Sequence, residues 1–194
     1  AYLNKFFSTN KLDKYSKLKA LITAGPTREY IDPVRYISNQ SSGKQGYEIA
    51  KSLAKTGVKT ILITGPTSLI SPENVNTVKV ETADEMFEKT KKILPVDIAI
   101  CAAAVSDFKI LNYQNKKIKR KDKINLSFKK NIDILSYLSN HNSSRPKLVV
   151  GFAAETDNLI NNAQEKILTK HCDWIIANDI SNKKIGFNSD LNEV

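Results

Sequence analysis

The residues best suited to hold an anion follow the first apolar segment of the chain. A Gly-Pro-Thr turn at 25–27 comes directly after the β-branched run 20–24, and the segment 39–46 (NQSSGKQG) opens a predicted helix. Backbone N–H groups at a helix start and the hydroxyls of the turn threonine and the two serines suit phosphate, and the turn glycine lets a ligand approach closely. The spacing matches neither G-x-G-x-x-G nor G-x-x-x-x-G-K-[ST], so it predicts a phosphate site of its own pattern. A helix start capped by Ser41 or Ser42 is the alternative.

Polar residues also follow other apolar runs. Asp107 comes after the alanines at 102–104, Glu155 comes after 151–154, and Asn178 follows a third run. Alanines at the end of a strand leave room for a flat ring or a ribose, and an aspartate there suits a ribose hydroxyl or a magnesium ion that carries phosphates. For Asp107 the alternative is an N-cap or an Asx-turn.

An alternation of buried strands and amphipathic helices must position these residues. Strands are expected near 20–24, 60–64, 75–80, 96–105, 124–128, 148–152 and 174–177, and helices near 46–57, 86–94, 131–140 and 157–171. This order predicts an α/β fold, with a Rossmann-like, doubly wound, mostly parallel sheet and helices on both faces. Such sheets bind ligands outside the carboxyl ends of their strands, which is where the polar residues stand.

Length and composition favour one domain. At 194 residues and 41% hydrophobic side chains, the chain can bury a full core but is short for two domains. Residues 1–18 lack periodicity and are expected to form a linker or an N-terminal arm before a domain at 19–194. No apolar run approaches the ~20 residues of a membrane span, and no signal-peptide pattern opens the chain, which predicts a cytoplasmic protein without a membrane partner. Cys101 and Cys172 lie outside any C-x-x-C pattern and are expected to pack as small apolar side chains.

The formal net charge of +10 is compatible with a nucleic-acid partner, an anionic small molecule or compositional bias. Lysines are spread over most polar segments, with one dense cluster at 116–121. A basic nucleic-acid-binding module would need a stacking platform, and no aromatic series accompanies the cluster. An NAD(P)-dependent oxidoreductase would share the sheet, and Tyr47-x-x-x-Lys51 and Tyr113-x-x-x-Lys117 superficially match its dyad. The second predicted strand, however, is followed by no acidic ribose ligand.

Taken together, the motifs resemble the phosphopantothenoylcysteine synthetase family. They are G-P-T-x-E at 25–29, I-D-x-V-R-Y-I-x-N-x-S-S-G-K at 31–44, A-A-A-V-S-D-F at 102–108, K-I-K at 117–119, N-x-D-I-L at 131–135, G-F-A-A-E-T at 151–156, D-W-I-x-A-N at 173–178 and G-F-N-S at 186–189. These motifs stand in the family's order and cover nearly everything from Lys19 onward. Gln45, Arg120 and Ile132 depart from the usual Met, Lys and Pro. The family carries further strands and a helix at its C-terminus, so the domain is expected to be shortened there.

The resemblance implies a CTP-dependent ligase. The carboxylate of 4′-phosphopantothenate attacks the α-phosphate of CTP and releases pyrophosphate, and the amine of L-cysteine then displaces CMP to form the amide. The resemblance implies CTP-binding roles for Gly25, Ser41, Ser42, Gly43, Ala103, Asp107, Phe108, Lys117, Lys119, Lys130 and Phe152. Lys117 would assist formation of the acyl-cytidylate and Asn39 would hold it, while Arg35 and Asn178 would contact substrate or intermediate.

The resemblance also implies cofactors and partners. Asp107 is the candidate ligand for a Mg²⁺ or Mn²⁺ ion that accompanies the nucleotide. In bifunctional members of the family an N-terminal decarboxylase that uses FMN precedes the synthetase, so FMN belongs to that half of a parent protein. The family dimerises through the synthetase half, so a homodimer is expected. A nucleic-acid partner is not expected.

Overall fold

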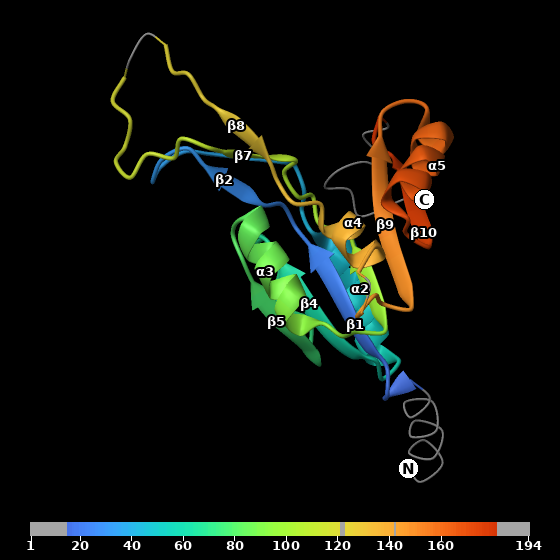
Figure 1. The fold of residues 1–194 in the computed structure, drawn as a ribbon. Helices are drawn as coiled ribbons and strands as arrows, with labels where there is room; N and C mark the ends of the chain where they lie inside the picture. Colours follow the sequence, from blue (N-terminus) through green and yellow to red (C-terminus); the bar gives the residue numbers. More distant parts are fainter. Residues whose placement is uncertain (1–14, 121–122, 142, 182–194) are drawn as a thin grey trace.

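The computed structural model describes residues 15–120, 123–141 and 143–181, so most of the predicted lead-in and the motif at 186–189 lie outside the described residues. Its centre is a six-stranded sheet in which every pairing is parallel (Figure 1). The strands are β1 (Lys19–Ala24), β4 (Lys59–Thr64), β5 (Val75–Lys79), β6 (Ile98–Cys101), β9 (Leu148–Glu155) and β10 (Trp174–Asp179). They lie in the order β5-β4-β1-β6-β9-β10. Counted along the chain this is 3-2-1-4-5-6, the Rossmann order, with its switch point between β1 and β6. The predicted fold class is confirmed.

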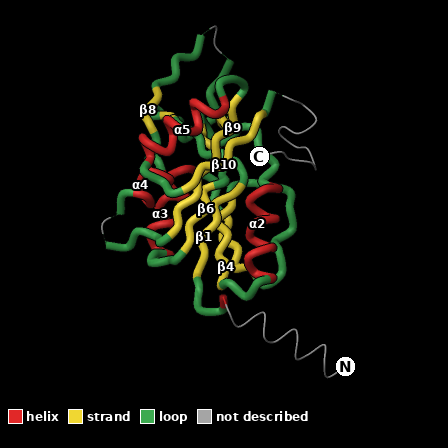
Figure 2. Tube along the Cα trace, turned by 90° about the vertical axis from the view of Figure 1, so that its right-hand side faces the viewer, coloured by secondary structure: helices red, strands yellow, loops and turns green. Residues whose placement is uncertain are grey.

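Helices cover both faces of the sheet, as predicted. They are α2 (Lys44–Lys55), α3 (Ala83–Ile93), α4 (Ile134–Ser139) and α5 (Leu159–Lys170). Figure 2 shows α2 on one face and the other three helices on the opposite face. Alternate residues of β1 explain the arrangement, because Ile22 packs in the cluster with Tyr47 of α2, whereas Leu21 packs in the cluster with Met86 of α3. Among the described residues no helix is long and apolar enough to cross a membrane.

Close packing places the start of α2 at the end of β1. A Cβ atom added at Gly46 would lie 2.5 Å from the Cβ of Ala24, so only a glycine allows the helix to approach the strand this closely. The N-cap of α2 is Gly43, with φ 77°, and no side chain caps the helix. The serine N-cap considered from the sequence is therefore wrong. The hydroxyl oxygens of Ser41 and Ser42 instead accept N–H groups two residues ahead, as in an ST-turn.

Two antiparallel hairpins project from the carboxyl edge of the sheet. One pairs β2 (Arg28–Tyr30) with β3 (Tyr36–Ser38), and the other pairs β7 (Phe108–Ile110) with β8 (Phe128–Lys130). We call residues 28–38, 108–120 and 123–130 the arm, which extends away from the sheet in Figure 1. The strand predicted at 124–128 is wrong in extent, because pairing begins only at Phe128.

Candidate functional site

A cavity of about 580 Å³ opens at the carboxyl ends of β6 and β9, beside α4 and α5. It is lined by Thr23, Cys101, Ala103, Val105, Ser106, Asp107, Phe108, Lys130, Asn131, Ile132, Asp133, Ile134, Leu135, Phe152, Lys166 and Lys170. The volume lies within the range of small-molecule sites. Three lysines face two aspartates in a lining that also holds two phenylalanines, so the cavity suits a flat ring attached to a multiply charged anion.

Five predicted site residues meet in this cavity. Ala103, Asp107 and Phe108 follow β6, Lys130 ends β8, and Phe152 lies within β9. They converge because parallel strands place their carboxyl ends along one edge, and because β8 pairs with the segment that follows β6. Phe152 lies 44 residues or more from the β6 group in the sequence, so no local pattern predicts this contact.

Asn131 fastens the end of β8 to the segment after β6. Its N–H donates to the carbonyl oxygen of Asp107 at 2.8 Å, and its Nδ2 donates to the carbonyl oxygen of Ser106 at 2.9 Å. Its Oδ1 is buried and has no partner within the described part of the chain. Lys130, the preceding residue, is thereby held at the mouth of the cavity. From the sequence, Asn131 was recognisable only as a member of the N-x-D-I-L motif.

Two cationic residues of α5 that sequence reasoning missed also line the cavity. Lys166 Nζ donates to the carbonyl oxygen of Phe152 at 2.7 Å, and Lys170 Nζ lies 2.7 Å from Oδ2 of Asp133. The two lysines are four residues apart and therefore share one face of the helix. That spacing was a usable signal, but it was lost among the many other lysines of the chain.

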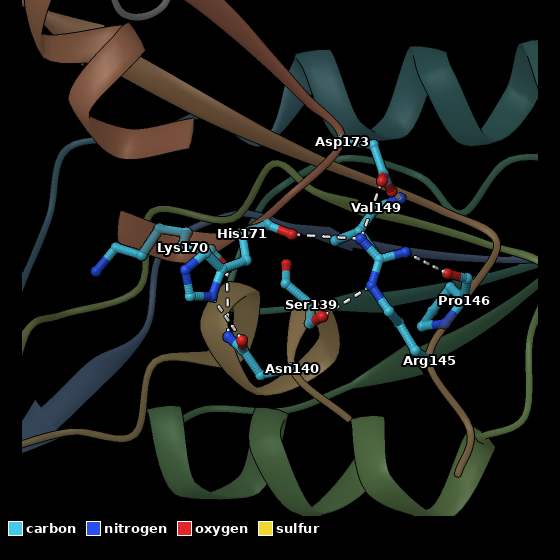
Figure 3. A network of polar contacts seen from close by, with 8 residues as sticks. All are labelled: Ser139, Asn140, Arg145, Pro146, Val149, Lys170, His171 and Asp173. Carbon is cyan, nitrogen blue, oxygen red and sulfur yellow. Dashed lines mark hydrogen bonds and ion pairs between the residues drawn. The ribbon is translucent and has the colours of Figure 1, made fainter. Parts of the chain in front are cut away.

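A polar network fixes the C-terminal end of α5 and so the position of these lysines (Figure 3). Arg145 donates to the carbonyl oxygens of Ser139 and His171 at 2.8 and 3.3 Å and pairs with Asp173 at 2.9 Å. His171 Nδ1 lies 2.7 Å from the side-chain oxygen of Asn140, which links α5 to α4. Because the ends of both helices share one network, the lysine face of α5 is held toward the cavity.

The cavity contains one thiol, and it is not an activated nucleophile. Burial raises the pKa of Cys101 to about 12, and the nearby Asp133 acts in the same direction. The group is therefore protonated at neutral pH, whereas nucleophilic attack needs the thiolate. This agrees with the prediction that the cysteine packs as a small apolar side chain.

Asp107 does not belong to a closed metal site in the part of the chain that the structure describes. Among the described residues no group of three or more His, Cys, Asp or Glu side chains is arranged to hold an ion. Mg²⁺ is commonly held by one or two carboxylates together with the phosphates of its substrate. A single exposed aspartate fits an ion that arrives with a triphosphate, and it does not fit a permanent metal centre.

A second group of predicted residues lies at the end of β1, outside the lining of the cavity. Gly25 and Gly43 have φ of 70° and 77°, a conformation that favours glycine. An added Cβ at either glycine would lie within 3 Å of the Thr67 methyl carbon. The first Gly-Pro-Thr turn, the start of α2 and the second Gly-Pro-Thr turn are thus packed together, with Ser41 and Ser42 beside them.

Two residues connect this glycine group to the cavity wall. Thr27 is fully buried, and its hydroxyl oxygen accepts the N–H of Ser106 at 3.0 Å. This bond links the first Gly-Pro-Thr turn to the cavity wall, and donation by the Thr27 hydroxyl to an oxyanion stays a prediction. Asn39 is exposed, and its Nδ2 donates to the carbonyl oxygen of Val105 at 3.1 Å. Asn39 therefore stands between the glycine group and the cavity.

The remaining predicted residues lie elsewhere. Arg35, Lys117 and Lys119 belong to the outer part of the arm, and none of them lines the cavity. Asn178 lies near the end of β10, with its side-chain oxygen buried and without a partner in the described residues. The structure thus brings the predicted residues to one edge of the sheet, but divides them among the cavity, the glycine group, the arm and the outer strand.

The chain itself crosses the place where a Rossmann dinucleotide would lie. After β1, the N–H of Arg28 donates to the carbonyl oxygen of Glu81 beyond β5, so β2 passes over the ends of β4 and β5. Neither oxidoreductase dyad is formed, since the Tyr47 hydroxyl accepts from Thr67 and Lys51 pairs with Glu48 on the outside of α2. The second pair, Tyr113 and Lys117, lies on the arm and outside the cavity lining. These contacts disfavour a nicotinamide-dependent oxidoreductase.

The strand order and the cationic cavity define a doubly wound α/β protein with an anion-suited site at its carboxyl edge. Residues 15–194 match the family described as the DNA/pantothenate metabolism flavoprotein C-terminal domain, and the chain belongs to that family. It is 44% identical over 192 residues to the coenzyme A biosynthesis bifunctional protein CoaBC of Haemophilus influenzae, covering 98% of this chain and 47% of the relative. The CoaBC protein of Borreliella burgdorferi is also 44% identical, over 99% of this chain and 48% of the relative. The chain thus spans about half the length of these relatives.

Solved structures agree with this assignment. A crystal structure of the C-terminal domain of a CoaBC protein has a TM-score of 0.74 and 39% identity, covering 85% of this chain and 79% of that one. The DNA/pantothenate metabolism flavoprotein from Streptococcus pneumoniae has a TM-score of 0.72 at 26% identity, covering 84% and 83% of the two chains. A structure of a Cab2 mutant in complex with phosphopantothenate-cysteine shares the fold, with a TM-score of 0.68 at 18% identity, and covers 94% and 81%.

Proposed function

We propose that the chain is a phosphopantothenoylcysteine synthetase, which joins 4′-phosphopantothenate to L-cysteine at the expense of CTP in coenzyme A biosynthesis. The observation that carries the proposal is the cavity whose lining includes three lysines and two phenylalanines, namely Lys130, Lys166, Lys170, Phe108 and Phe152. Ammonium groups neutralise a triphosphate, and aromatic rings pack on a base or a ribose. Membership of the family supports the same reaction.

CTP occupies the cavity, with its base and ribose among the apolar residues. Ala103 leaves space beside Phe152, and Asp107 lies where a ribose hydroxyl or a phosphate-bound Mg²⁺ or Mn²⁺ would be held. The ion supplies charge neutralisation for the triphosphate when it is bound. Lys166 and Lys170 now hold a carbonyl oxygen and Asp133, and both ammonium groups are within reach of an anion in the same cavity.

The first step is attack by a carboxylate oxygen of 4′-phosphopantothenate on the α-phosphorus of CTP. A new P–O bond forms and the bond to the β-phosphate bridge breaks, so pyrophosphate leaves with the electron pair. Transfer of this kind needs alignment and charge neutralisation more than covalent help from the protein. Lys117 and Lys119 of the arm supply positive charge for this step together with Lys130, while Gly25 and Gly43 let a phosphate approach the backbone.

The second step is attack by the cysteine amine on the acyl carbon of the acyl-cytidylate. The C–N bond forms, CMP leaves with its oxygen, and the amine loses a proton to solvent. Asn39 holds the intermediate because an amide can both donate and accept hydrogen bonds. Its position between the glycine group and Val105 suits this role. Arg35 and Asn178 are assigned contacts with substrate or intermediate.

The assay that tests this reaction measures pyrophosphate and amide separately, in the whole protein supplied with CTP, 4′-phosphopantothenate and cysteine. Lys117→Gln is expected to lower pyrophosphate release at least about a hundredfold, because it removes a charge needed in the first transition state. Asn39→Asp is expected to release pyrophosphate but to form little amide. Lys55→Gln, at the end of α2 and away from the cavity, is the control for loss of one positive charge.

Three outcomes separate the candidate functions. Binding of CTP with Mg²⁺ in preference to NADPH and to oligonucleotides supports the ligase. Preferential binding of NADPH would restore the oxidoreductase, and salt-sensitive binding of oligonucleotides would restore the nucleic-acid module. Equal loss of the first step in the Lys117 and Asn39 variants would contradict the proposed division of labour between the two residues.

Partners and location follow from the same proposal. The parent protein carries an N-terminal decarboxylase that binds FMN, since the relatives of double length are named as bifunctional. The synthetase part forms a homodimer through the arm, where large apolar side chains such as Leu111 and Phe128 are exposed. The substrates are cytoplasmic metabolites, so the protein works in the cytoplasm without a membrane or nucleic-acid partner.

A further inference from the structure

We propose that Asp32 is a positioning residue for the ligase, and that it fixes the Lys117–Lys119 segment of the arm by holding the backbone of Ile118. This inference rests on the proposed function, because that function assigns the lysines to the first step. Asp32 itself touches neither the cavity nor either lysine side chain. Its action on the reaction is therefore indirect.

Asp32 is a fully buried carboxylate in the turn between β2 and β3. One oxygen, Oδ1, accepts the N–H groups of Val34 and Arg35, both at 2.9 Å, and so closes the turn. The other oxygen, Oδ2, accepts Nε of Arg35 at 3.0 Å and Nη2 at 2.5 Å. Hydrogen bonds from Arg35 hold the pKa of Asp32 well below its usual range, so the carboxylate is charged at neutral pH. A turn closed in this way would need no further partner.

Asp32 nevertheless has a further hydrogen-bond partner, Ile118, which lies 86 residues away in the sequence. The N–H of Ile118 donates to Oδ2 of Asp32 at 3.0 Å. The carbonyl oxygen of Ile118 accepts Nη2 of Arg35 at 2.8 Å. Both backbone polar groups of one residue are thus held by an ion pair, and we call this arrangement the Asp32–Arg35 clasp. The clasp fixes the orientation of the segment as well as its position, because it holds the peptide planes on both sides of Ile118.

The clasp restrains a segment with little other support. Ile118 is half-buried, whereas residues 111–117, 119 and 120 are exposed. Gln114 makes the other backbone contact between this segment and the β2–β3 hairpin, donating its N–H to the carbonyl oxygen of Ile31 at 3.0 Å. The two lysines are the immediate neighbours of Ile118 in the chain. Holding both peptide planes of Ile118 against the hairpin therefore restricts the backbone positions from which Lys117 and Lys119 reach out, so the two residues act as one preformed cationic unit.

Positioning of this kind matters because a free lysine segment would lose conformational entropy each time it met the triphosphate. A hydrogen bond that a backbone N–H donates to a buried carboxylate restricts the segment beforehand. The aspartate and arginine of the I-D-x-V-R motif therefore position the lysine segment. This role requires no contact between their side chains and the substrate. Arg35 serves the clasp and can also contact substrate, whereas buried Asp32 serves only the turn and the clasp.

The test compares three variants of the whole protein. Asp32→Asn keeps the shape of the side chain and removes its charge. Ile118→Pro removes the N–H that Asp32 accepts and leaves the Asp32–Arg35 pair in place, so it tests the clasp even where Asp32→Asn impairs folding. Asp97→Asn is the matched control, because Asp97 is another carboxylate that accepts a backbone N–H and a cationic side chain, but at the amino ends of the strands.

Amide hydrogen exchange is the first measurement, and it does not depend on activity. Asp32→Asn is expected to speed exchange of the Ile118 amide at least about tenfold, with little change in β1 or β6. Asp97→Asn is expected to leave the Ile118 amide unchanged. Unchanged exchange at Ile118 in Asp32→Asn would overturn the proposal, whatever the protein is found to catalyse.

A double-mutant cycle on pyrophosphate release is the second measurement. Asp32→Asn and Ile118→Pro are each expected to slow the first step ten- to a hundredfold through misplacement of the lysines. In the Lys117→Gln, Lys119→Gln background, neither substitution should slow it further, because the groups that it positions are gone. Additive losses would show that Asp32 acts by another route. A wild-type protein that releases no pyrophosphate from CTP would refute the ligase and leave the exchange result standing.

Discussion

A methyl group at Gly65 would lie 1.6 Å from the carbonyl oxygen of Pro26, a distance that no side-chain adjustment relieves. Gly65→Ala is therefore expected to lower the free energy of unfolding by about 3 kcal/mol, the upper part of the range for overpacking. Urea denaturation followed by circular dichroism measures the change. The two Gly-Pro-Thr turns are forced apart by this substitution, so the glycine group at the end of β1 loses its packing as well.

Gly151→Ala is the matched comparison for that prediction. Its added Cβ would meet side-chain ends, Leu135 Cδ2 at 2.5 Å and Ile175 Cδ1 at 2.8 Å, and these can move. The expected loss is about 1 kcal/mol. A loss at Gly151 as large as the loss at Gly65 would contradict the view that the backbone contact at Pro26 decides the cost.

Individual site residues could be predicted where a strand end determines their place. Asp107 was identified because parallel strands bring residues after their carboxyl ends to one edge. Phe108, Lys130 and Phe152 were named only through the family resemblance. Lys166 and Asn131 were given no role, since their roles depend on how α5 and β8 pack against that edge. The strand ends were thus predictable from the residues alone, whereas the helix and hairpin contributions were not.

Strands and helices of the sheet were predicted from buried runs and periodicity, whereas the arm was not. β6 and β9 could be predicted because a strand that is covered on both faces has a nearly continuous apolar sequence. The strands of the arm have three residues each and gain their order from distant contacts such as Asp32 with Ile118. Short polar hairpins held by side chains far apart in sequence leave no periodic pattern to read.

Asp97 joins the amino ends of three central strands and gives the fold a pH dependence. Its Oδ2 accepts the N–H of Lys19 at 3.0 Å, and its Oδ1 pairs with Lys147 at 3.0 Å. These two contacts, the first the larger, lower its pKa from the usual 3.8 against the opposing effect of burial. The unfolded state then binds the proton more tightly, so the stabilisation is complete above about pH 5, begins to fall near 3.8 and is lost as the pH falls through the lower pKa of the folded state.

Asp97→Asn is therefore expected to lower the free energy of unfolding by about 1–2 kcal/mol at pH 7, the loss of a hydrogen bond to a charged group. The difference from the wild type should shrink as the pH falls below about 4, where the wild-type carboxylate also becomes protonated. Thermal unfolding at several pH values measures the difference between variant and wild type at pH 7 and its decrease in acid. Glu165→Gln, which removes an exposed carboxylate on α5, should show no such convergence, and a constant difference for Asp97→Asn across the pH range would refute the assignment.

At the scale of the whole molecule, apolar surface gathers on the arm. Seven of the thirteen exposed large apolar side chains among the described residues lie there, namely Val34, Tyr36, Phe108, Leu111, Tyr113, Ile124 and Phe128. The arm also carries the lysines assigned to the first step and projects from the edge that holds the cavity (Figure 1). An exposed apolar surface of this kind is typical of a protein interface. A dimer formed through the arm would therefore bring two lysine segments and two cavities into one assembly.

Leu111→Asp is expected to convert that homodimer to a monomer, because it places a charge in the apolar interface without touching the sheet. Leu111 is 65% exposed, so the substitution leaves the stability of the subunit unchanged. Sedimentation velocity of the 21.7 kDa chain distinguishes the two masses. Leu168→Asp is the control, since Leu168 is 73% exposed but lies on α5. A wild-type chain that sediments as a monomer, or equal dissociation by both substitutions, would show that the apolar surface of the arm serves another purpose than pairing two subunits.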